Sequence, residues 1–418
     1  MSVQPVPHVL VSPGAIGEIP RLVHEAGLQG DYLLVADENT YEAAGSAVHD
    51  ILSAAGHSVV ECILRRDGLL IPDERAVGEV TLALSENTRA MVAVGAGTIN
   101  DLAKIVAYRA HIPYAAVATA PSMDGYPSPL APITVRRFKR TYRAVPPAVI
   151  VADLNILARA PADMIRAGLG DVIGKYTALA DWMLGHVITD ERYSHEIAAE
   201  VRESTDRAAG LIGHDQDDAD LVEAVTRALI STGTSMARWG NSRPASGSEH
   251  HIAHYWEMYA GLSGVKEHLH GIRVGVACVM VAGLFHRLFA MSETEVRTRL
   301  SHAVPETRSE LEARVHEVFG PIAEEVLAWR DGQFRNEASR LERHERIIEH
   351  WQSLQQWVRS NVPRPEHIAG LLRRCGAPSA PEEIGFAHEG KEATMRNACE
   401  VRPIYTVLRL AQDLGVLR

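Results

Sequence analysis

Residues 90–104 of the 418-residue chain read AMVAVGAGTINDLAK, and this stretch decides the class of fold. The apolar run up to Val94 predicts a buried strand, Gly95 and Gly97 predict a tight turn, and the segment from Thr98 predicts a helix. A strand, a glycine turn and a helix together form the unit from which parallel sheets are built. The turn can bind a phosphate at the helix N-terminus, although such turns are about as often purely structural.

The glycine spacing in this stretch is GAGTxxD, with Asp101 one turn into the helix. It differs from the GxGxxG fingerprint of ordinary dinucleotide-binding folds. Asp101 suits either a ligand-binding role or the start of a helix. The turn alone therefore does not identify a nucleotide site.

Apolar runs alternate with helical patterns over the first ~150 residues, as in parallel α/β sheets. We predict an N-terminal α/β domain over residues 1–160, with a Rossmann-like parallel sheet, the kind of sheet that binds dinucleotides and other ligands at the carboxyl ends of its strands. The five predicted strands are residues 31–37, 57–64, 90–97, 114–121 and 148–154.

The pattern changes near Pro161, beyond which long segments with helical periodicity replace the strand signals. The first of these segments is ADMIRAGLGDVIGKYTALADWMLGH, and a charged amphipathic stretch follows from Ser292 to Pro365. We predict an all-α domain over residues 161–418, which contains the candidate metal and substrate residues described below.

Composition limits the function classes. A formal net charge of -11 argues against a nucleic-acid partner, but leaves room for an anionic small-molecule substrate in a local basic pocket. The four cysteines form no CxxC pair, which excludes a cysteine zinc site and is typical of reduced thiols in the cytoplasm. We expect no signal peptide, and no membrane span because the longest apolar runs are short.

The helical half contains an Asp and His pattern typical of a catalytic metal site. Asp171 lies in AGLGDVIGK, His250 and His254 lie four apart in SGSEHHIAHYWEM, and His270 precedes a glycine in KEHLHGIRV. One carboxylate with two imidazoles suits zinc, iron or nickel and leaves coordination positions open for substrate. With 20 histidines in the chain, a lone histidine has only about one chance in ten of being a ligand. His251 and His268 are the expected bystanders.

A proline-rich loop, ATAPSMDGYPSPLAPI, follows the fourth predicted strand. It contains Thr119, Ser122, Asp124 and Ser128, and rigid loops at strand ends often carry binding residues. A turn that only connects the domains is the alternative interpretation.

The order of these motifs resembles the polyol-phosphate dehydrogenase branch of the iron-containing alcohol dehydrogenase and dehydroquinate synthase-like superfamily. GAGTxxD, then SMDGxxSP, then Asp171, GSEHxxxHYWE and HLHG follow one another in that order. The sequence is most similar to the bacterial type of sn-glycerol-1-phosphate dehydrogenases. The resemblance covers roughly residues 8 to 280, with a fainter echo in RPIYTVLRLAQDLGVL at residues 402–417.

The resemblance implies a set of nucleotide-binding residues for NAD or NADP. It assigns the pyrophosphate to the glycine turn, the adenosine ribose to the end of the first predicted strand and the nicotinamide to the proline-rich loop. The residues are Asp37 for the ribose, Gly95, Gly97, Thr98 and Asp101 for the pyrophosphate, and Thr119, Ser122, Ser128 and Leu130 for the nicotinamide.

The resemblance also implies that Asp171, His250 and His270 hold one divalent zinc, nickel or iron ion. Asp124 would contact the substrate and His254 would lie beside it, where it can move a proton. Lys175, four residues after Asp171 on the same helix face, is a third catalytic candidate. Related enzymes imply a homodimer or larger homo-oligomer.

One position departs from the pattern. Many relatives have HGExV after the last ligand, whereas this chain has HGIRV, with Ile272 and Arg273. The missing acid would remove a hydrogen-bond partner of His270.

The expected reaction is reduction of dihydroxyacetone phosphate to sn-glycerol 1-phosphate, with a metal that stabilises the developing alkoxide. The substrate phosphate needs a cation, and three candidates stay open: the basic run RRFKRTYRA at residues 136–144, Lys175 and Arg273. The run is as often a solvated charge cluster. The alternatives are a sugar-phosphate cyclase of the dehydroquinate synthase type, a dehydrogenase of an unphosphorylated polyol such as glycerol, and a metal-binding protein without catalysis.

Overall fold

The computed structural model describes residues 8–136, 138–213, 218–263, 265–330, 337–386 and 390–417. The chain forms two compact units. Unit 1 comprises residues 1–172 and 203–242, and unit 2 comprises residues 173–202 and 243–418. The predicted boundary between residues 160 and 161 lies just before helix α7 (Ala162–Thr189), whereas the compact units divide within that helix.

Unit 1 is built on a six-stranded sheet in which every neighbouring pair is parallel. The prediction of a parallel α/β sheet is confirmed, and each of the five predicted strands is present within a few residues of its predicted bounds. The strand order is β1-β8-β5-β4-β2-β3. The strands are β1 (His8–Ser12), β2 (Asp31–Asp37), β3 (Val59–Leu64), β4 (Thr88–Gly95), β5 (Tyr114–Ala118) and β8 (Val149–Asp153).

Three strands were not predicted. Edge strand β1 pairs only with β8 and is mostly half-exposed, so its five residues give a weak apolar signal. A separate antiparallel hairpin joins β6 (Leu130–Val135) to β7 (Phe138–Arg143). Its second strand lies in the basic run, where alternating charged residues hide the strand pattern. Arg137, one of the five basic residues of that run, lies outside the described residues.

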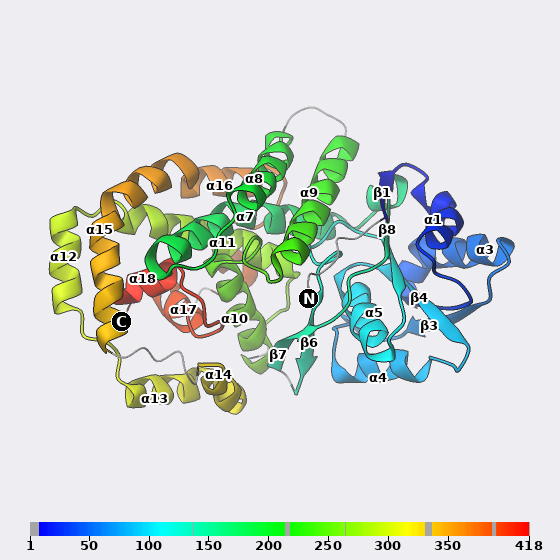
Figure 1. Ribbon diagram of the computed structural model, residues 1–418, viewed down its shortest axis with the longest axis horizontal. Coiled ribbons are helices and arrows are strands. Elements are labelled where there is room, and N and C mark those ends of the chain that lie inside the picture. The colour runs from blue at the N-terminus through cyan, green and yellow to red at the C-terminus, as the bar shows by residue number, and fades with distance from the viewer. Residues whose placement is uncertain are drawn as a thin grey trace. The chain divides into compact units, whose positions relative to one another are not determined.

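Side chains alternate between the two faces of the sheet and form two apolar cores. Leu33, Val35 and Met91 pack with α4 (Glu74–Leu82) and α5 (Gly97–Ala110). Leu34, Val92 and Val94 pack on the other face with α1 (Ile19–Glu25) and α3 (Ser46–Ala54). This period of two follows from strand geometry, and Figure 1 shows the helices on both sides of the sheet. Short elements complete this part: η1 (Ala15–Glu18), α2 (Glu38–Thr40), η2 (Tyr41–Gly45) and α6 (Leu154–Leu157).

The strand order places a topological switch point between β2 and β4. The chain moves outward from β2 to β3 in one direction and from β4 to β5 in the other. Open α/β sheets bind ligands at the carboxyl ends of the strands that flank such a point. Asp37 and Gly95 end these two strands, so two of the predicted nucleotide-binding residues lie at the expected edge.

After β8, the described residues form helices and no further strand, as predicted. Helices α8 (His195–Gly210) and α9 (Asp218–Trp239) follow α7, and helix α9 packs in unit 1. The helices of unit 2 are α10 (Ser248–Ser263), α11 (His270–Leu288), α12 (Glu293–His302), α13 (Arg308–Phe319), η3 (Gly320–Ile322), α14 (Ala323–Arg330), α15 (Glu337–Asn361), α16 (Pro365–Arg374), η4 (Pro381–Ile384), α17 (Lys391–Ala398) and α18 (Val407–Asp413).

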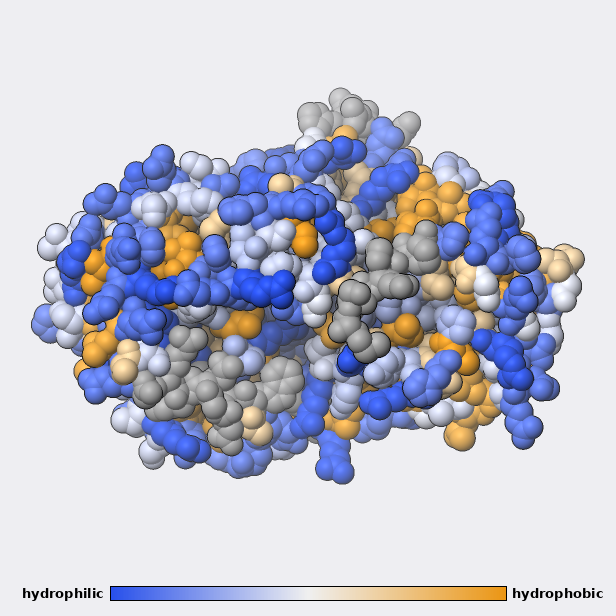
Figure 2. Space-filling model, in the orientation of Figure 1, coloured by the Kyte–Doolittle hydropathy of each residue, from blue (hydrophilic) through white to orange (hydrophobic). Residues whose placement is uncertain are grey.

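Helix α11 is the one helix of the described chain that is long and apolar enough to cross a membrane. Its most apolar window is 72% buried within the protein, so it serves as a core helix of unit 2. Figure 2 shows a mainly hydrophilic surface on the face in view, with apolar residues in separate groups. The apolar run predicted to be too short for a membrane lies inside this 19-residue helix.

Candidate active site

The glycine turn between β4 and α5 depends on close packing. A Cβ on Gly95 would lie 2.5 Å from the Cβ of Ile99, and a Cβ on Gly97 would lie 3.0 Å from the Cγ of Met123. Neither glycine has a positive φ, so the need for glycine comes from the space and not from the backbone angle. The turn leads into the N-terminus of a 14-residue helix, whose first N–H groups suit an anion.

Lys104 ties the helix after this turn to the proline-rich loop. Its ammonium donates to the carbonyl of Gly125 at 2.6 Å and of Leu130 at 3.2 Å, and pairs with Asp101 at 3.1 Å. Lys104 is completely buried, and burial lowers the pKa of its ammonium. Asp101, which was predicted to bind the pyrophosphate, therefore pairs with the lysine that holds the proline-rich loop. Lys104 was not predicted, although it lies one turn after Asp101 in the quoted stretch.

The proline-rich loop is held between two helices of unit 1 by glycines. A Cβ on Gly168 of α7 would lie 1.7 Å from the carbonyl oxygen of Pro121, and one on Gly233 of α9 would lie 2.3 Å from that of Asp124. The backbone N–H of Asp124 donates to Asp171 Oδ2 at 3.0 Å. Two predicted site residues of unit 1 are thus brought together.

The other predicted nucleotide residues lie around the same edge of the sheet. Thr119 and Ser122 are buried at the end of β5, and Ser128 accepts from the N–H of Leu130 at 3.2 Å. Thr98 is partly exposed in the first turn of α5. Asp37 is partly exposed and caps the short helix that follows β2 by accepting from Thr40 N. Their roles toward a nucleotide stay predictions.

Three histidines of unit 2 converge from two helices. His250 and His254 lie one turn apart on α10, and His270 begins α11. The ring centroids are 5.2 Å apart for His250 and His270, and 5.1 Å for His254 and His270. The motif spacing that suggested a metal site therefore corresponds to one cluster of imidazoles within unit 2.

Glu257 links two of these histidines. Its Oε1 lies 2.7 Å from His270 Nδ1, and its Oε2 lies 3.0 Å from His254 Nδ1. The acid that is missing at Ile272 therefore does not leave His270 without a carboxylate partner, because Glu257, from the neighbouring helix, supplies one. Glu257 was missed as a site residue, although it ends the GSEHxxxHYWE motif one turn after His254.

His250 has its own carboxylate partner. Glu249, fully buried, lies 2.9 Å from His250 Nδ1 and also accepts from Thr177 Oγ1 at 2.8 Å and Gly247 N at 2.7 Å. Burial raises the pKa of Glu249, while these hydrogen bonds oppose the rise. A carboxylate on Nδ1 orients the ring and leaves Nε2 as the nitrogen for a metal.

The remaining catalytic candidates differ in their surroundings. Lys175 is completely buried on α7, and its charge acts on Glu249. Arg402 lies 3.1 Å from His254 Nε2, on the opposite side of the ring from Glu257. Arg402 begins the tail motif and was not predicted. His251, an expected bystander, is buried, and burial lowers the pKa of its ring well below the usual value.

The histidine cluster of unit 2 offers donor atoms of the kind that a divalent metal needs. His254, Glu257 and His270 each offer a ligand atom within 4.8 Å of the others. Imidazole and carboxylate are the ligands that zinc, nickel and iron share. His250 and His270 both carry a carboxylate on Nδ1, the usual support of metal-bound histidines. This donor set shares only His270 with the predicted ligands Asp171, His250 and His270, whose combination stays a prediction.

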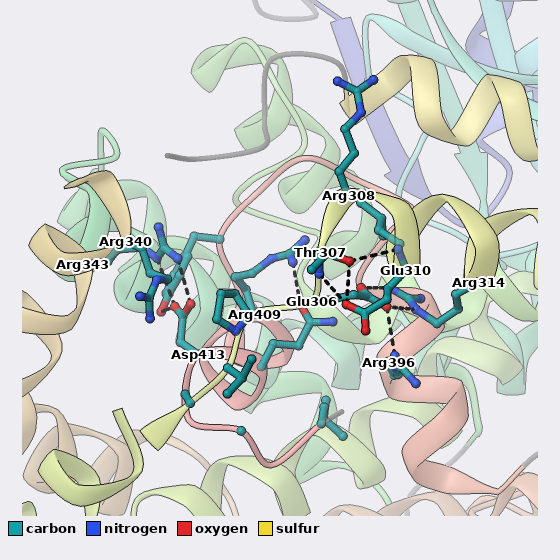
Figure 3. Close-up of a pocket in the computed structure, with 18 of the residues that line it drawn as sticks. Glu306, Thr307, Arg308, Glu310, Arg314, Arg340, Arg343, Arg396, Arg409 and Asp413 are labelled. Carbon is teal, nitrogen blue, oxygen red and sulfur yellow. Dashed lines mark hydrogen bonds and ion pairs between the residues drawn. The ribbon is translucent and has the colours of Figure 1, made fainter. Parts of the chain in front are cut away.

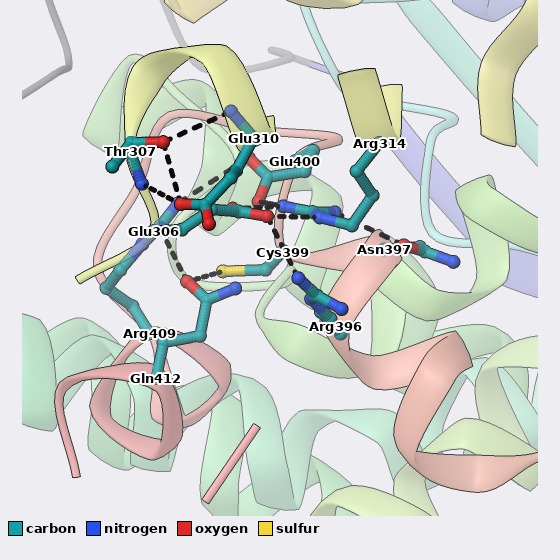
Figure 4. Close-up of polar contacts among 10 residues, drawn as sticks. All are labelled: Glu306, Thr307, Glu310, Arg314, Arg396, Asn397, Cys399, Glu400, Arg409 and Gln412. Carbon is teal, nitrogen blue, oxygen red and sulfur yellow. Dashed lines mark hydrogen bonds and ion pairs between the residues drawn. The ribbon is translucent and has the colours of Figure 1, made fainter. Parts of the chain in front are cut away.

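A separate cavity of about 1420 Å³ lies in unit 2, lined by α13, the start of α15 and the C-terminal segment. Figures 3 and 4 show arginines and carboxylates that already pair across it. Arg343 binds both oxygens of Asp413, and Arg314 binds both oxygens of Glu306 and one of Glu400. No predicted site residue is among its described lining, so this cavity is not the candidate active site.

Comparison with known proteins decides the family. Residues 10–161 match the family model "iron-containing alcohol dehydrogenase". A glycerol-1-phosphate dehydrogenase [NAD(P)+] of Geobacillus thermodenitrificans is 30% identical over 376 residues, 88% of this chain and 83% of the relative. The corresponding protein of Halalkalibacterium halodurans is 38% identical over 277 residues, 65% of this chain and 68% of the relative. The chain belongs to the glycerol-1-phosphate dehydrogenase family.

A glycerol-1-phosphate dehydrogenase [NAD(P)+] of Thermococcus kodakarensis is 33% identical over 279 residues, 66% of this chain and 77% of the relative. Solved structures show the same fold at lower identity. A probable glycerol dehydrogenase from Sinorhizobium meliloti has a TM-score of 0.59 and 16% identity, and covers 97% of this chain and 94% of its own. An NADH-dependent butanol dehydrogenase from Thermotoga maritima has a TM-score of 0.57, 17% identity, and coverages of 99% and 97%. The predicted family and fold are confirmed.

Proposed function

We propose that this protein is a metal-dependent NAD(P)H oxidoreductase that interconverts dihydroxyacetone phosphate and sn-glycerol 1-phosphate. One observation carries the proposal furthest: His250 and His270 each have Nδ1 held by a carboxylate, within a family whose relatives are named for this activity. The relatives' names favour this reaction over a sugar-phosphate cyclase and over oxidation of an unphosphorylated polyol.

Asp171, His250 and His270 are the proposed metal ligands, and the nucleotide is proposed to bind at the switch point of the sheet. When bound, the metal polarises the substrate carbonyl and the reduced nicotinamide supplies the hydride. The chain's own residues orient these groups. Glu249 and Glu257 fix the two imidazole rings, and Lys104 fixes the loop at residues 125–130 proposed to lie against the nicotinamide.

His254 is the proposed proton donor to the alkoxide oxygen. Glu257 accepts from its Nδ1 and Arg402 donates toward its Nε2 in a hydrogen-bonded chain, so a protonated ring would deliver its proton from Nε2 once the substrate oxygen replaces Arg402 there. Such a chain holds the ring in one orientation during proton transfer. Asp37 is proposed to bind the adenosine ribose, and its carboxylate favours NADH because it repels a 2′-phosphate. A cytoplasmic homo-oligomer remains the expectation for the assembled enzyme.

The test is an assay of NADH oxidation at pH 7 with the protein reconstituted separately with nickel, zinc or iron. Dihydroxyacetone phosphate, dihydroxyacetone and a heptulosonate phosphate are compared at equal concentration. We expect NADH consumption that is fastest with dihydroxyacetone phosphate and is lost after chelation. A preference for dihydroxyacetone would identify a polyol dehydrogenase instead, and turnover of the heptulosonate phosphate without net loss of NADH would identify a cyclase.

A further inference from the structure

Arg273 is a buried cation whose hydrogen-bonding capacity is not used. It lies on α11 and is only 4% exposed. Its Nε and Nη2 atoms have no hydrogen-bond partner within the described part of the chain. Burial lowers the pKa of the guanidinium, yet arginine stays protonated in proteins, so the charge remains inside unit 2. Burying a charge without hydrogen bonds is costly and calls for an explanation.

Its position relative to the histidine cluster supplies that explanation. Arg273 follows His270 by three residues, so the two side chains share one face of α11. The same oxygen, Glu257 Oε1, lies 2.7 Å from His270 Nδ1 and 3.8 Å from Arg273 Nη1. The distance of 3.8 Å is an ion-pair contact and too long for a hydrogen bond. Glu257 therefore offsets part of the positive charge of Arg273, while the N–H groups of Nε and Nη2 still have no acceptor among the described residues.

The chemistry of those donors points to an oxyanion with two adjacent acceptors. A guanidinium presents N–H groups in a planar fork that matches two oxygens of a phosphate. Nε and Nη2, the two unpartnered nitrogens, form one such fork. The other candidates are less suitable: Lys175 is buried beside Glu249, and the described basic residues of the hairpin are partly or fully exposed on β7 and its turn.

We infer that Arg273 binds the phosphate of the substrate and sets the preference for phosphorylated over unphosphorylated polyols. This inference rests on the proposed function and deepens it, because it names the group that reads the phosphate.

The experiment compares Arg273→Leu and Arg273→Lys with the wild type on dihydroxyacetone phosphate and on dihydroxyacetone. For Arg273→Leu we expect the ratio of the two kcat/KM values to fall on the order of 100-fold, because the phosphate loses a paired set of charged hydrogen bonds. Arg273→Lys keeps the charge but not the fork and is expected to lose less. Arg287→Leu on the same helix removes an exposed arginine and should leave the ratio unchanged.

An equal loss on both substrates would overturn the inference, since it would mean that Arg273 only positions Glu257 and His270. A second readout separates this result from failure of the proposed function. Inorganic phosphate and glycerol 1-phosphate should raise the melting temperature of the wild type and not that of Arg273→Leu. If the wild type shows no turnover but keeps this difference, the phosphate site stands and the proposed reaction is wrong. If phosphate stabilises both proteins equally, Arg273 is not the phosphate site.

Discussion

At the scale of single residues, one carboxylate determines how two histidines are presented. Glu257 contacts His254 and His270 through different oxygens and also faces Arg273. A substitution of Glu257 is expected to loosen the orientation of the His254 and His270 rings while every proposed metal ligand remains. Its effect therefore measures how much of the site depends on support from neighbouring groups.

Glu257→Gln is expected to weaken metal binding by about 10- to 100-fold, because an amide is a poorer partner for the N–H of a metal-binding histidine. Metal content after dialysis and the affinity from nickel titration are the measurements. Glu203→Gln, a change at a glutamate whose side chain is 77% exposed, is the control and should bind metal like the wild type. Wild-type affinity in Glu257→Gln would show that Glu257 does not support the metal site.

His254→Asn tests the proposed proton transfer. We expect kcat to fall by about 10²- to 10⁴-fold, the usual contribution of a general acid. We also expect the dependence of kcat on pH to change, since the imidazole would be lost. Unchanged turnover with an unchanged pH profile would eliminate His254 from this role.

Much of the site at this scale was accessible from the sequence. His250, His254 and His270 could be named because their motifs have a fixed order, and the structure brings them into one cluster. Glu257 and Lys104 could not, because a glutamate or lysine one turn along a helix is ordinary in sequence and gains its role only from a partner elsewhere in the chain. The orphaned nitrogens of Arg273 are likewise visible only in three dimensions.

At the scale of elements, helix α7 supports its neighbours through small and buried residues. Gly168 allows the proline-rich loop to approach the helix, and Asp181 accepts from the first N–H groups of α10 and α18. The N–H groups are those of Ser248 and Val407, each at 2.6 Å from a carboxylate oxygen. One helix thus fixes the loop in unit 1 and two helix N-termini in unit 2.

Gly168→Ala is expected to lower the free energy of unfolding by about 1–3 kcal/mol or more, because the added methyl group overlaps the Pro121 carbonyl and the loop must move. The KM for NADH should rise as well. Chemical denaturation and initial rates are the measurements. Gly210→Ala, on a helix with open space at that position, is the matched control and should be neutral or slightly stabilising. Equal behaviour of the two variants would contradict the packing argument.

Asp181 gives a prediction for pH. Burial and the nearby Glu249 raise the pKa of Asp181 from the ordinary value of about 4 for an aspartate to about 7. The folded state therefore holds this proton more tightly than the unfolded state, so the contribution of Asp181 to stability falls as pH rises from about 4 to about 7. Asn at this position cannot titrate. The stability difference between the wild type and Asp181→Asn should shrink by a few kcal/mol over that range.

Urea denaturation of both proteins at pH 5, 6, 7 and 8 checks this expectation. A difference that stays constant, or that grows with pH, would show that the helix N–H groups already keep Asp181 ionised at pH 5.

The element boundaries themselves were largely predictable, because apolar runs and helical periods follow local geometry. Strands β1 and β7 were not, since an exposed edge and a run of arginines lack the apolar signal of a buried strand.

At the scale of the whole molecule, an arginine and carboxylate network holds the C-terminal segment in unit 2. Arg314 contacts Glu306 and Glu400, Arg396 also contacts Glu306, and Arg343 contacts Asp413 (Figures 3 and 4). The paired side chains come from segments far apart in the sequence. These pairs connect α13 and α15 to the end of the chain.

Arg314→Met is expected to destabilise unit 2 by about 3–5 kcal/mol, because it leaves the buried carboxylate of Glu400 without its closest cation. Arg308→Met, at a side chain that lines the same cavity but is 69% exposed, should change stability by less than about 1 kcal/mol. Thermal unfolding of both variants is the measurement. Similar melting temperatures for the two would show that the network contributes little.

Each compact unit is built from two separate stretches of the chain, and this has a consequence for how the protein is synthesised. Unit 1 includes residues 203–242, and Val222 and Ile230 of that segment complete one of its cores. The last strand of the sheet ends at Asp153, so a translating ribosome must add roughly ninety residues before unit 1 and this core are complete. Unit 2 waits longer still, because Val407, Leu408 and Leu410 are completely buried in it. During synthesis, nascent chains therefore carry uncovered apolar surface of the kind that molecular chaperones bind.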